Sequence, residues 1–327
     1  MTAVATGKEV QIQTISKEEL LDQLEVLKQS VIDRDVGLFG PDSMFWRVNR
    51  HLAMFLGAGR AALLQTAHPW VANAIDQHSK TKTDPMGRFR RTFTNVFTMV
   101  YGNMDQVLNS CITVHNIHAT MFGQISEDSG AFDEGHNYQA NEVYAMVWVH
   151  ATLWETSIKM YELVVGPLTP AEKEAYYQET RLFAYCFGIP DSALPDNWNE
   201  FLEYNETMWN SDILKVEKDA EEIADFLFKF QPILQPALNH YKVITSMMMP
   251  ERIREEYNLP PATRKNIDTY ERFINVFSKS YRFIPDRFKY LPPYVEANRR
   301  LAGKHKPDFI TAMMSKAMLG TPRLVSA

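Results

Sequence analysis

Three segments decide the fold: LLQTAHPWVANAIDQHS at residues 63–79, DPMGRFRRTFTNVFTMVYG at 84–102 and VHNIHATMFGQ at 114–124. In the second segment, basic and polar side chains recur at the three- and four-residue spacing that places them on one face of a helix; they are Arg88, Arg91, Thr92 and Asn95. Phenylalanine and valine residues occupy another face at the same spacing. Burying polar groups costs free energy unless something binds them. This helix therefore predicts a site for a flat, anionic, partly apolar ligand.

The third segment carries a pair of histidines. His115 and His118 lie three residues apart, about 300° around a helix, so only one of them need face a given ligand. Histidine is an axial ligand of haem iron, and arginine pairs with carboxylates such as the haem propionates. The two segments together predict a haem pocket. A zinc site is disfavoured because two histidines supply too few ligands.

Helical signals continue along the rest of the chain. SKEE at 16–19 and TPAE at 169–172 are capping boxes, and Asp84-Pro85 opens the arginine helix. A second helical segment is predicted from Pro41 to a break at Pro69, and another from residue 104 to about 123. Few alternating β-branched runs occur. We expect an all-α fold, with a flexible tail over 1–14 and one multi-helix globular domain over 15–327 that encloses a b-type haem.

Composition excludes several classes of protein. The 34 basic and 40 acidic residues give a net charge of −6, which offers no basic surface for nucleic acid. Cys111 and Cys186 are too few for a disulfide framework and fit a reducing compartment. The N-terminus lacks the apolar core of a signal peptide, and no apolar run of about 18 residues predicts a membrane span. We therefore expect a cytoplasmic protein.

The stretch GAGRAA at 57–62 satisfies a dinucleotide-binding fingerprint. That fingerprint requires a strand before it and a parallel strand after its helix. The preceding residues have helical spacing and the following segment meets Pro69, so a nucleotide site is disfavoured. Two readings remain: Gly57 and Gly59 allow a close approach of helices, or they leave room for a porphyrin plane.

Six short motifs occur in a fixed order. They are HP at 68–69, HS at 78–79, DPxGR at 84–88, RxxxT at 88–92, HxxxxG at 118–123 and WVHAT at 148–152. As a set they resemble the MpaB/rubber-oxygenase catalytic domain family, which includes the latex-clearing protein, over roughly residues 46–254. The resemblance implies an all-helical, b-type haem oxygenase that uses O2 to cleave a C=C bond, in terpenoid chains where the substrate is known.

The resemblance also implies roles for individual residues. Arg88 and Thr92 match the family's arginine and threonine, and His118 matches its proximal haem histidine. In the latex-clearing branch a lysine three residues after the arginine can ligate iron distally, and here that position is Arg91. Arginine stays protonated and does not normally ligate iron. We therefore expect that Arg91 does not occupy the distal position of the iron as the lysine can. No glutamate between residues 47 and 88 matches that branch's base.

We expect Nε2 of His118 to ligate the iron while Nδ1 is held by a carbonyl or carboxylate. Arg88, and with it Arg91, would pair with propionates or polarise bound O2. Thr92 would donate a hydrogen bond in the pocket.

Further histidines and a carboxylate supply other candidates. Asp76, His68 and His78 are predicted as distal acid/base or orienting groups, because histidine transfers protons near neutral pH. His150, flanked by apolar residues, is predicted to be buried and to have at most a secondary role in the pocket.

The predicted substrate is an apolar, isoprenoid-like alkene held in a channel of Phe, Met and Trp, with O2 as co-substrate and carbonyl products. The haem iron would do the oxygen chemistry while the protein supplies geometry and excludes water. Two other classes stay open. One is a non-catalytic haem-binding or gas-sensing protein, and the other is a cofactor-free helical interaction protein. The sequence leaves the exact substrate, any electron donor and the oligomeric state open.

Overall fold

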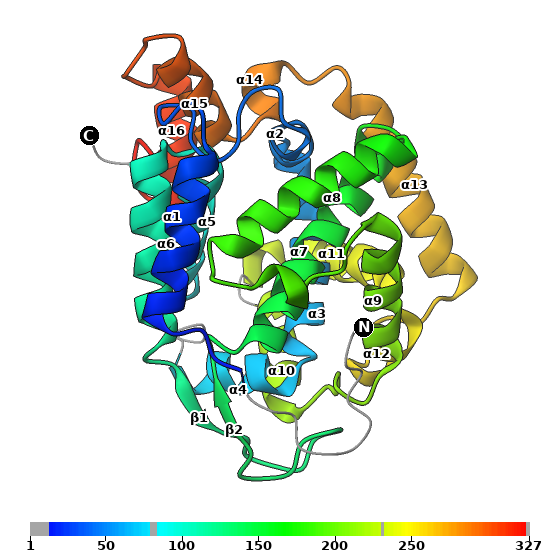
Figure 1. Ribbon diagram of the computed structural model, residues 1–327. Coiled ribbons are helices and arrows are strands. Elements are labelled where there is room, and N and C mark those ends of the chain that lie inside the picture. The colour runs from blue at the N-terminus through cyan, green and yellow to red at the C-terminus, as the bar shows by residue number, and fades with distance from the viewer. Residues whose placement is uncertain (1–12, 79–83, 230–231, 325–327) are drawn as a thin grey trace.

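Helices build the body of the molecule in the computed structural model, which describes residues 13–78, 84–229 and 232–324 (Figure 1). The α-helices of these residues are α1 (Lys17–Ser30), α2 (Met44–Asn49), α3 (Ala58–Thr66), α4 (Pro69–His78), α5 (Pro85–Tyr101), α6 (Met104–His118), α7 (Val143–Val164), α8 (Pro170–Tyr185), α9 (Trp198–Asn210), α10 (Lys218–Lys229), α11 (Gln235–Met248), α12 (Glu251–Glu256), α13 (Arg264–Tyr281), α14 (Asp286–Lys289), α15 (Pro292–Leu301) and α16 (Phe309–Leu319). Three 3-10 helices join them: η1 (Leu52–Gly57), η2 (Asp191–Ala193) and η3 (Pro232–Leu234). The predicted all-α fold is confirmed.

The central element is α7, which is apolar around most of its circumference and buried along most of its length. It packs against α2, η1, α3, α8, α9 and α13, and Figure 1 shows it in the middle of the molecule. Because WVHAT lies on this helix, His150 is in the core, at 5 % exposure. The prediction that His150 is buried is confirmed.

Local capping chemistry starts several helices where the sequence predicted. Ser16 and Glu19 form a reciprocal capping box before α1, and Thr169 and Glu172 form another before α8. The side chain of Asp84 accepts a hydrogen bond from the Gly87 amide at 2.9 Å and caps α5. These caps satisfy amide groups that have no partner inside the helix.

The segment predicted as one helix from Pro41 is instead divided into α2, η1 and α3. The backbone is extended at His51, where it forms a bridge to Tyr290 of the distant C-terminal part. At the next junction, a Cβ on Gly57 would lie 2.6 Å from both Met160 Cγ and Thr156 Cγ2 of α7. Gly57 therefore permits the close approach of η1 to α7. Because η1 precedes GAGRAA, the strand needed by a dinucleotide site is not present there.

A small hairpin interrupts the helical pattern and was missed from the sequence. β1 (Phe122–Gln124) pairs antiparallel with β2 (Asn137–Gln139), and both contact α4 at the bottom of Figure 1. The helix predicted to reach residue 123 ends at His118, because the chain turns there and the Ala140 amide donates to the Met121 carbonyl. His118 is consequently a terminal helical residue next to a turn.

The N-terminal end of the described chain is joined to the start of α7. The Ile15 amide donates to the Asn141 carbonyl at 3.0 Å, and the Val143 amide donates to the Gln13 carbonyl at 2.9 Å. Residues 1–12 of the predicted tail lie outside the described residues. No helix within the described ranges is long and apolar enough to cross a membrane.

Candidate functional site

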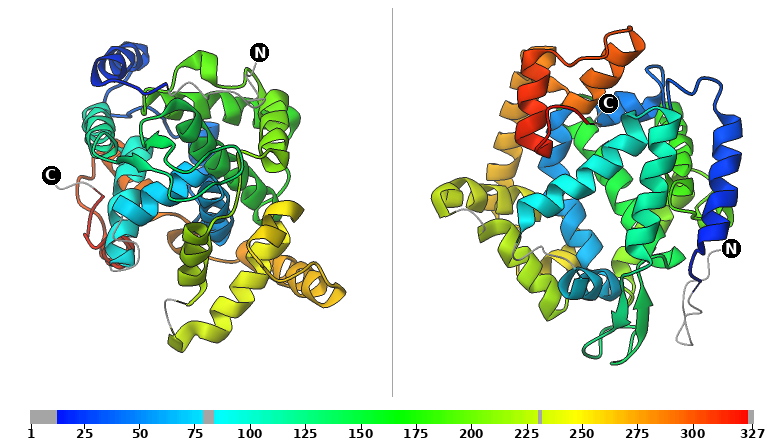
Figure 2. Two further views of the ribbon diagram at one scale, coloured as in Figure 1. Left: turned by 90° about the horizontal axis from the view of Figure 1, so that it is seen from below. Right: turned by 90° about the vertical axis from the view of Figure 1, so that its left-hand side faces the viewer.

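The arginine helix and the histidine helix are neighbours. α5 and α6 pack against each other, and the Ser110 hydroxyl of α6 donates to the Asn95 carbonyl of α5 at 3.1 Å. They run in opposite directions and diverge away from the turn that joins them (Figure 2, right). The N-terminal half of α5, with Arg88 and Thr92, and the C-terminal end of α6, with His118, therefore lie at the same, open end of this pair.

His118 presents a neutral imidazole. The residue is half-buried, and its Nδ1 is enclosed with no hydrogen-bond partner among the described residues. Burial lowers the pKa of His118 to about 4, with a smaller contribution from His115, while the side chain of Asn141 opposes the shift. An unprotonated imidazole is the form that binds a metal. The Phe187 ring lies 6.4 Å away, centroid to centroid, and nearly parallel.

Asn141 lies beside both histidines, which the sequence did not reveal. It is 2 % exposed, and its Nδ2 donates to the His115 carbonyl at 3.2 Å. The side chain of Asn141 also interacts with the His118 side chain and raises the pKa of that histidine, against the larger effect of burial. Asn141 thus connects the loop before α7 to the end of α6. It belongs to none of the six motifs, so only the folded chain identifies it.

His115 is buried at 6 % exposure, and its Nδ1 also lacks a partner among the described residues. Burial, and secondarily Lys17, lowers its pKa. The helical spacing required only one of the two histidines to face a ligand. The structure places it inside, one helical turn before His118.

The arginine face is only partly covered. Arg88 is half-buried, and burial lowers its pKa, with Arg91 contributing second. Arg91 and Thr92 are exposed, and Arg91 pairs with Asp84 at 3.2 Å. An exposed pair of this kind contributes little to stability, so Arg91 can exchange Asp84 for another anion at small cost.

A ladder of aromatic rings lies beside the arginine face. Phe55 of η1 contacts Phe89, Phe93 and Phe97 of α5 at centroid distances of 5.8, 5.1 and 6.4 Å. Phe89 and Phe93 are themselves 4.4 Å apart and half-buried. An apolar ladder next to cationic side chains matches a ligand that is flat, apolar and anionic at its edge.

The three distal candidates of the sequence lie around the hairpin. His68 is buried beside Trp70 and Phe132, burial lowers its pKa to about 3, and the Trp70 amide donates to its Nδ1 at 3.3 Å. His78 is exposed at the end of α4, with Nε2 2.9 Å from the Phe122 carbonyl oxygen. Asp76 is half-buried and acts on Tyr138, whose pKa rises to about 12, chiefly through burial. Their proposed distal roles stay predictions.

His150 and His118 lie at opposite ends of a pair of phenylalanine rings. Trp154 Nε1 donates to Nδ1 of His150 at 2.9 Å, whereas its Nε2 is enclosed and unpartnered among the described residues. Burial lowers the pKa of His150 to about 3. Its ring lies 6.3 Å from Phe183, which lies 5.3 Å from Phe187, the neighbour of His118.

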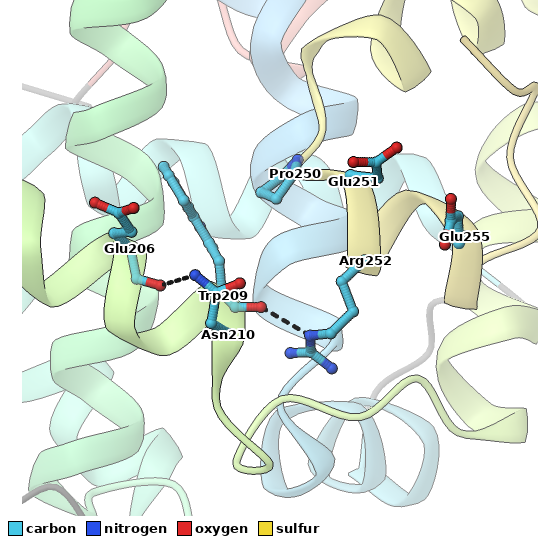
Figure 3. A pocket seen from close by; sticks show the side chains of 7 residues that line it. All are labelled: Glu206, Trp209, Asn210, Pro250, Glu251, Arg252 and Glu255. Atoms are coloured by element: carbon cyan, nitrogen blue, oxygen red, sulfur yellow. Dashed lines mark hydrogen bonds between the residues drawn. The ribbon is translucent and has the colours of Figure 1, made fainter.

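Two concave regions of the surface lie elsewhere. One, of about 470 Å³, is lined by residues of α9, α12 and the segment before α12 (Figure 3): Glu206, Trp209, Asn210, Pro250, Glu251, Arg252 and Glu255. The other, of about 880 Å³, lies between α11 and α13. Neither is lined by a residue that the sequence predicted for the site.

The donor set fits a haem better than a multi-ligand metal centre. No three His, Cys, Asp or Glu residues of the described chain gather to hold a metal ion. A haem iron needs only one protein ligand. The neutral imidazole of His118, the half-buried guanidinium of Arg88 and the adjacent phenylalanines have the chemistry of the iron ligand, the anion partner and the apolar wall that a haem requires.

Comparison with known families identifies an oxygenase family. The profile described as "ER-bound oxygenase mpaB/B'/Rubber oxygenase, catalytic domain" matches residues 46–278, more than two thirds of the chain. The match includes all six motifs and extends beyond the boundary near residue 254 that the motifs indicated. Searches of curated proteins and of solved structures found no significant match.

Proposed function

This chain belongs to the ER-bound mpaB/B′ and rubber oxygenase family, and from that premise we propose that it is a haem b-dependent oxygenase acting on an apolar, isoprenoid-like alkene. Family membership supports oxygenase activity and the use of O2. The proposal goes further: oxidative C=C cleavage to carbonyl products. The observation that carries it is the neutral, half-buried imidazole of His118, which lies at the same end of the α5–α6 pair as Arg88.

Each of these residues would have a different role in the haem-loaded protein. His118 would hold the iron through Nε2, and Arg88 and Arg91 would pair with the propionates. Bound haem supplies the activation of O2. Thr92 would donate a hydrogen bond towards the reacting oxygen, and the phenylalanine ladder of α5 would hold the apolar chain and exclude water.

Asn141 is our candidate for orienting His118. The expectation was a carbonyl or carboxylate beside Nδ1, and the carboxamide that the structure places against this ring is a neutral equivalent. The hydrogen bond of Asn141 to the His115 carbonyl fixes the carboxamide relative to α6. The imidazole would then keep one orientation when the other nitrogen binds iron.

The test is turnover by the haem-loaded protein. Protein reconstituted with haemin is given a panel of isoprenoid alkenes, and O2 consumption and trapped carbonyl products are measured. Substrate-dependent O2 uptake with carbonyl products supports the proposal. Haem binding without O2 uptake on any alkene would instead support the gas-sensing alternative, and a colourless protein that binds no haemin would support the cofactor-free one.

We also propose a cytoplasmic location, because two cysteines are too few for the disulfide framework of a secreted protein. Cell fractionation tests it. Recovery of the protein in a membrane fraction would contradict it.

A further inference from the structure

The two cysteines, 75 residues apart in sequence, meet in the fold. Cys111 lies in α6 and Cys186 directly follows α8, and they are 1 % and 0 % exposed. Both cysteines belong to one buried hydrophobic cluster, and the thiol of Cys186 donates to the Leu182 carbonyl oxygen at 3.7 Å. A hydrogen bond with the Cys186 side chain contributes, after burial, to the raised pKa of the Cys111 thiol. These are the only cysteines in the chain, so each has the other as its single thiol neighbour.

A second contact joins the same two segments. Phe187, next to Cys186, lies beside the ring of His118, seven residues after Cys111 on the same face of α6. α1 also packs against both α6 and α8. The end of α8 is therefore aligned with α6 at more than one point. A covalent bond between the sulfurs would join segments that already lie together.

We propose that Cys111 and Cys186 form a reversible intramolecular disulfide when the protein meets a hydroperoxide or another two-electron thiol oxidant. In the hydroperoxide reaction one sulfur attacks the peroxide oxygen, giving a sulfenic acid and an alcohol. The second thiol then displaces water from that sulfenic acid as the S–S bond forms. Two thiols lose two electrons and two protons in total, and the hydroperoxide is reduced to alcohol and water.

Burial determines how fast this occurs. Burial raises the pKa of the Cys111 thiol well above its usual range, and the thiolate is the reactive form. Oxidation therefore proceeds from local openings around the two buried cysteines and is slower than for an exposed thiol. Once formed, the bond would fix the helix that carries His118 to the end of α8. This inference does not depend on haem binding.

The experiment uses the full chain, oxidised with hydrogen peroxide or with diamide and then alkylated under denaturing conditions. Intact-mass and peptide mass spectrometry should show both thiols lost together, a mass decrease of about two hydrogens, and a peptide pair linked through Cys111 and Cys186. Dithiothreitol should restore both thiols. Cys111→Ser and Cys186→Ser serve as matched controls and should each leave one cysteine that forms no intramolecular link.

The effect of the disulfide on the helix that carries His118 can be measured without an activity assay. Hydrogen exchange in the C-terminal half of α6 should slow in the oxidised wild-type protein and stay unchanged in both serine variants after the same treatment. Two fully alkylatable thiols after prolonged diamide exposure would overturn the proposal. So would oxidation that gives only sulfinic acids or links between molecules.

Discussion

Replacement of Asn141 by alanine should weaken haem binding without unfolding the protein. The change removes the carboxamide that lies against His118 and donates to the His115 carbonyl at 3.2 Å. The His115 carbonyl keeps the Ala119 amide as a helical donor, so no acceptor is stranded. The structural loss is one buried hydrogen bond, about 1 kcal/mol of the free energy of unfolding.

The expected loss in haem affinity is larger than the loss in stability. Removing the outer partner of a metal-bound histidine typically costs about 10- to 100-fold in affinity, or about 1.4 to 2.7 kcal/mol. Haem affinity is measured by titrating haemin into apoprotein and following the Soret band, and stability by urea unfolding of the apoprotein. Asn141→Asp retains an acceptor oxygen and should hold haem better than Asn141→Ala does.

Asn137 supplies the matched control. It lies in β2, four residues before Asn141, is exposed, and its side-chain oxygen accepts from Gln124 Nε2 at 3.3 Å. Asn137→Ala should leave haem affinity and the spectrum unchanged. The reasoning is refuted if Asn141→Ala folds normally and binds haem as tightly as the wild type, or if both alanine variants lose affinity equally.

Three further outcomes are expected. Thr92→Ala should keep its haem and lose turnover by about a hundredfold, because one pocket donor is removed; full haem with full activity would remove Thr92 from the mechanism. Gly57→Ala should lower the free energy of unfolding by about 1–3 kcal/mol in a urea titration, because its Cβ would meet Met160 and Thr156 at 2.6 Å. An unchanged free energy of unfolding would show that these side chains of α7 move aside without cost and would contradict the prediction. Acidification should destabilise the apoprotein, because the pKa of His150 is about 3 in the folded protein and 6.5 in the unfolded chain. Below pH 6.5 the unfolded chain therefore binds a proton that the folded protein does not. The free energy of unfolding falls as a result, by up to about 2 kcal/mol at pH 5. His150→Phe should therefore show a smaller stability difference between pH 7 and pH 5, and an equal difference would contradict the assignment.

The parts of this structure that the sequence predicted are set by local chemistry. Three helices begin where the sequence predicted, directly after Ser16, Asp84 and Thr169. In each case the side chain of that residue caps a backbone amide within the next three residues. The shared face of Arg88, Arg91 and Thr92 follows from helical spacing alone. How far each of these side chains is covered depends on the neighbouring elements, so spacing could not show that Thr92 is exposed while Arg88 is half-buried.

The unpredicted parts depend on contacts distant in sequence. The division of the second helical segment follows from the bridge between His51 and Tyr290, more than 200 residues away. The position of Asn141 beside the end of α6 requires the hairpin that returns the chain from α6 to α7. Periodicity and capping signals report only on residues close in sequence, so they indicate neither the His51–Tyr290 bridge nor the hairpin.

The most direct test of a haem site at the end of α6 is a Soret titration of three proteins: wild type, His118→Ala and His115→Ala. The two histidines lie on one helix, three residues apart, and the Nδ1 atom of each is enclosed without a partner among the described residues. Each variant therefore controls for the structural effect of removing a histidine from this end of α6. Our account predicts that wild type and His115→Ala bind one equivalent of haem with a histidine-ligated spectrum, while His118→Ala binds it weakly or not at all. If both variants bind haem with unchanged spectra, His118 is not the iron ligand, and if the wild type binds none, the protein is not a haem oxygenase.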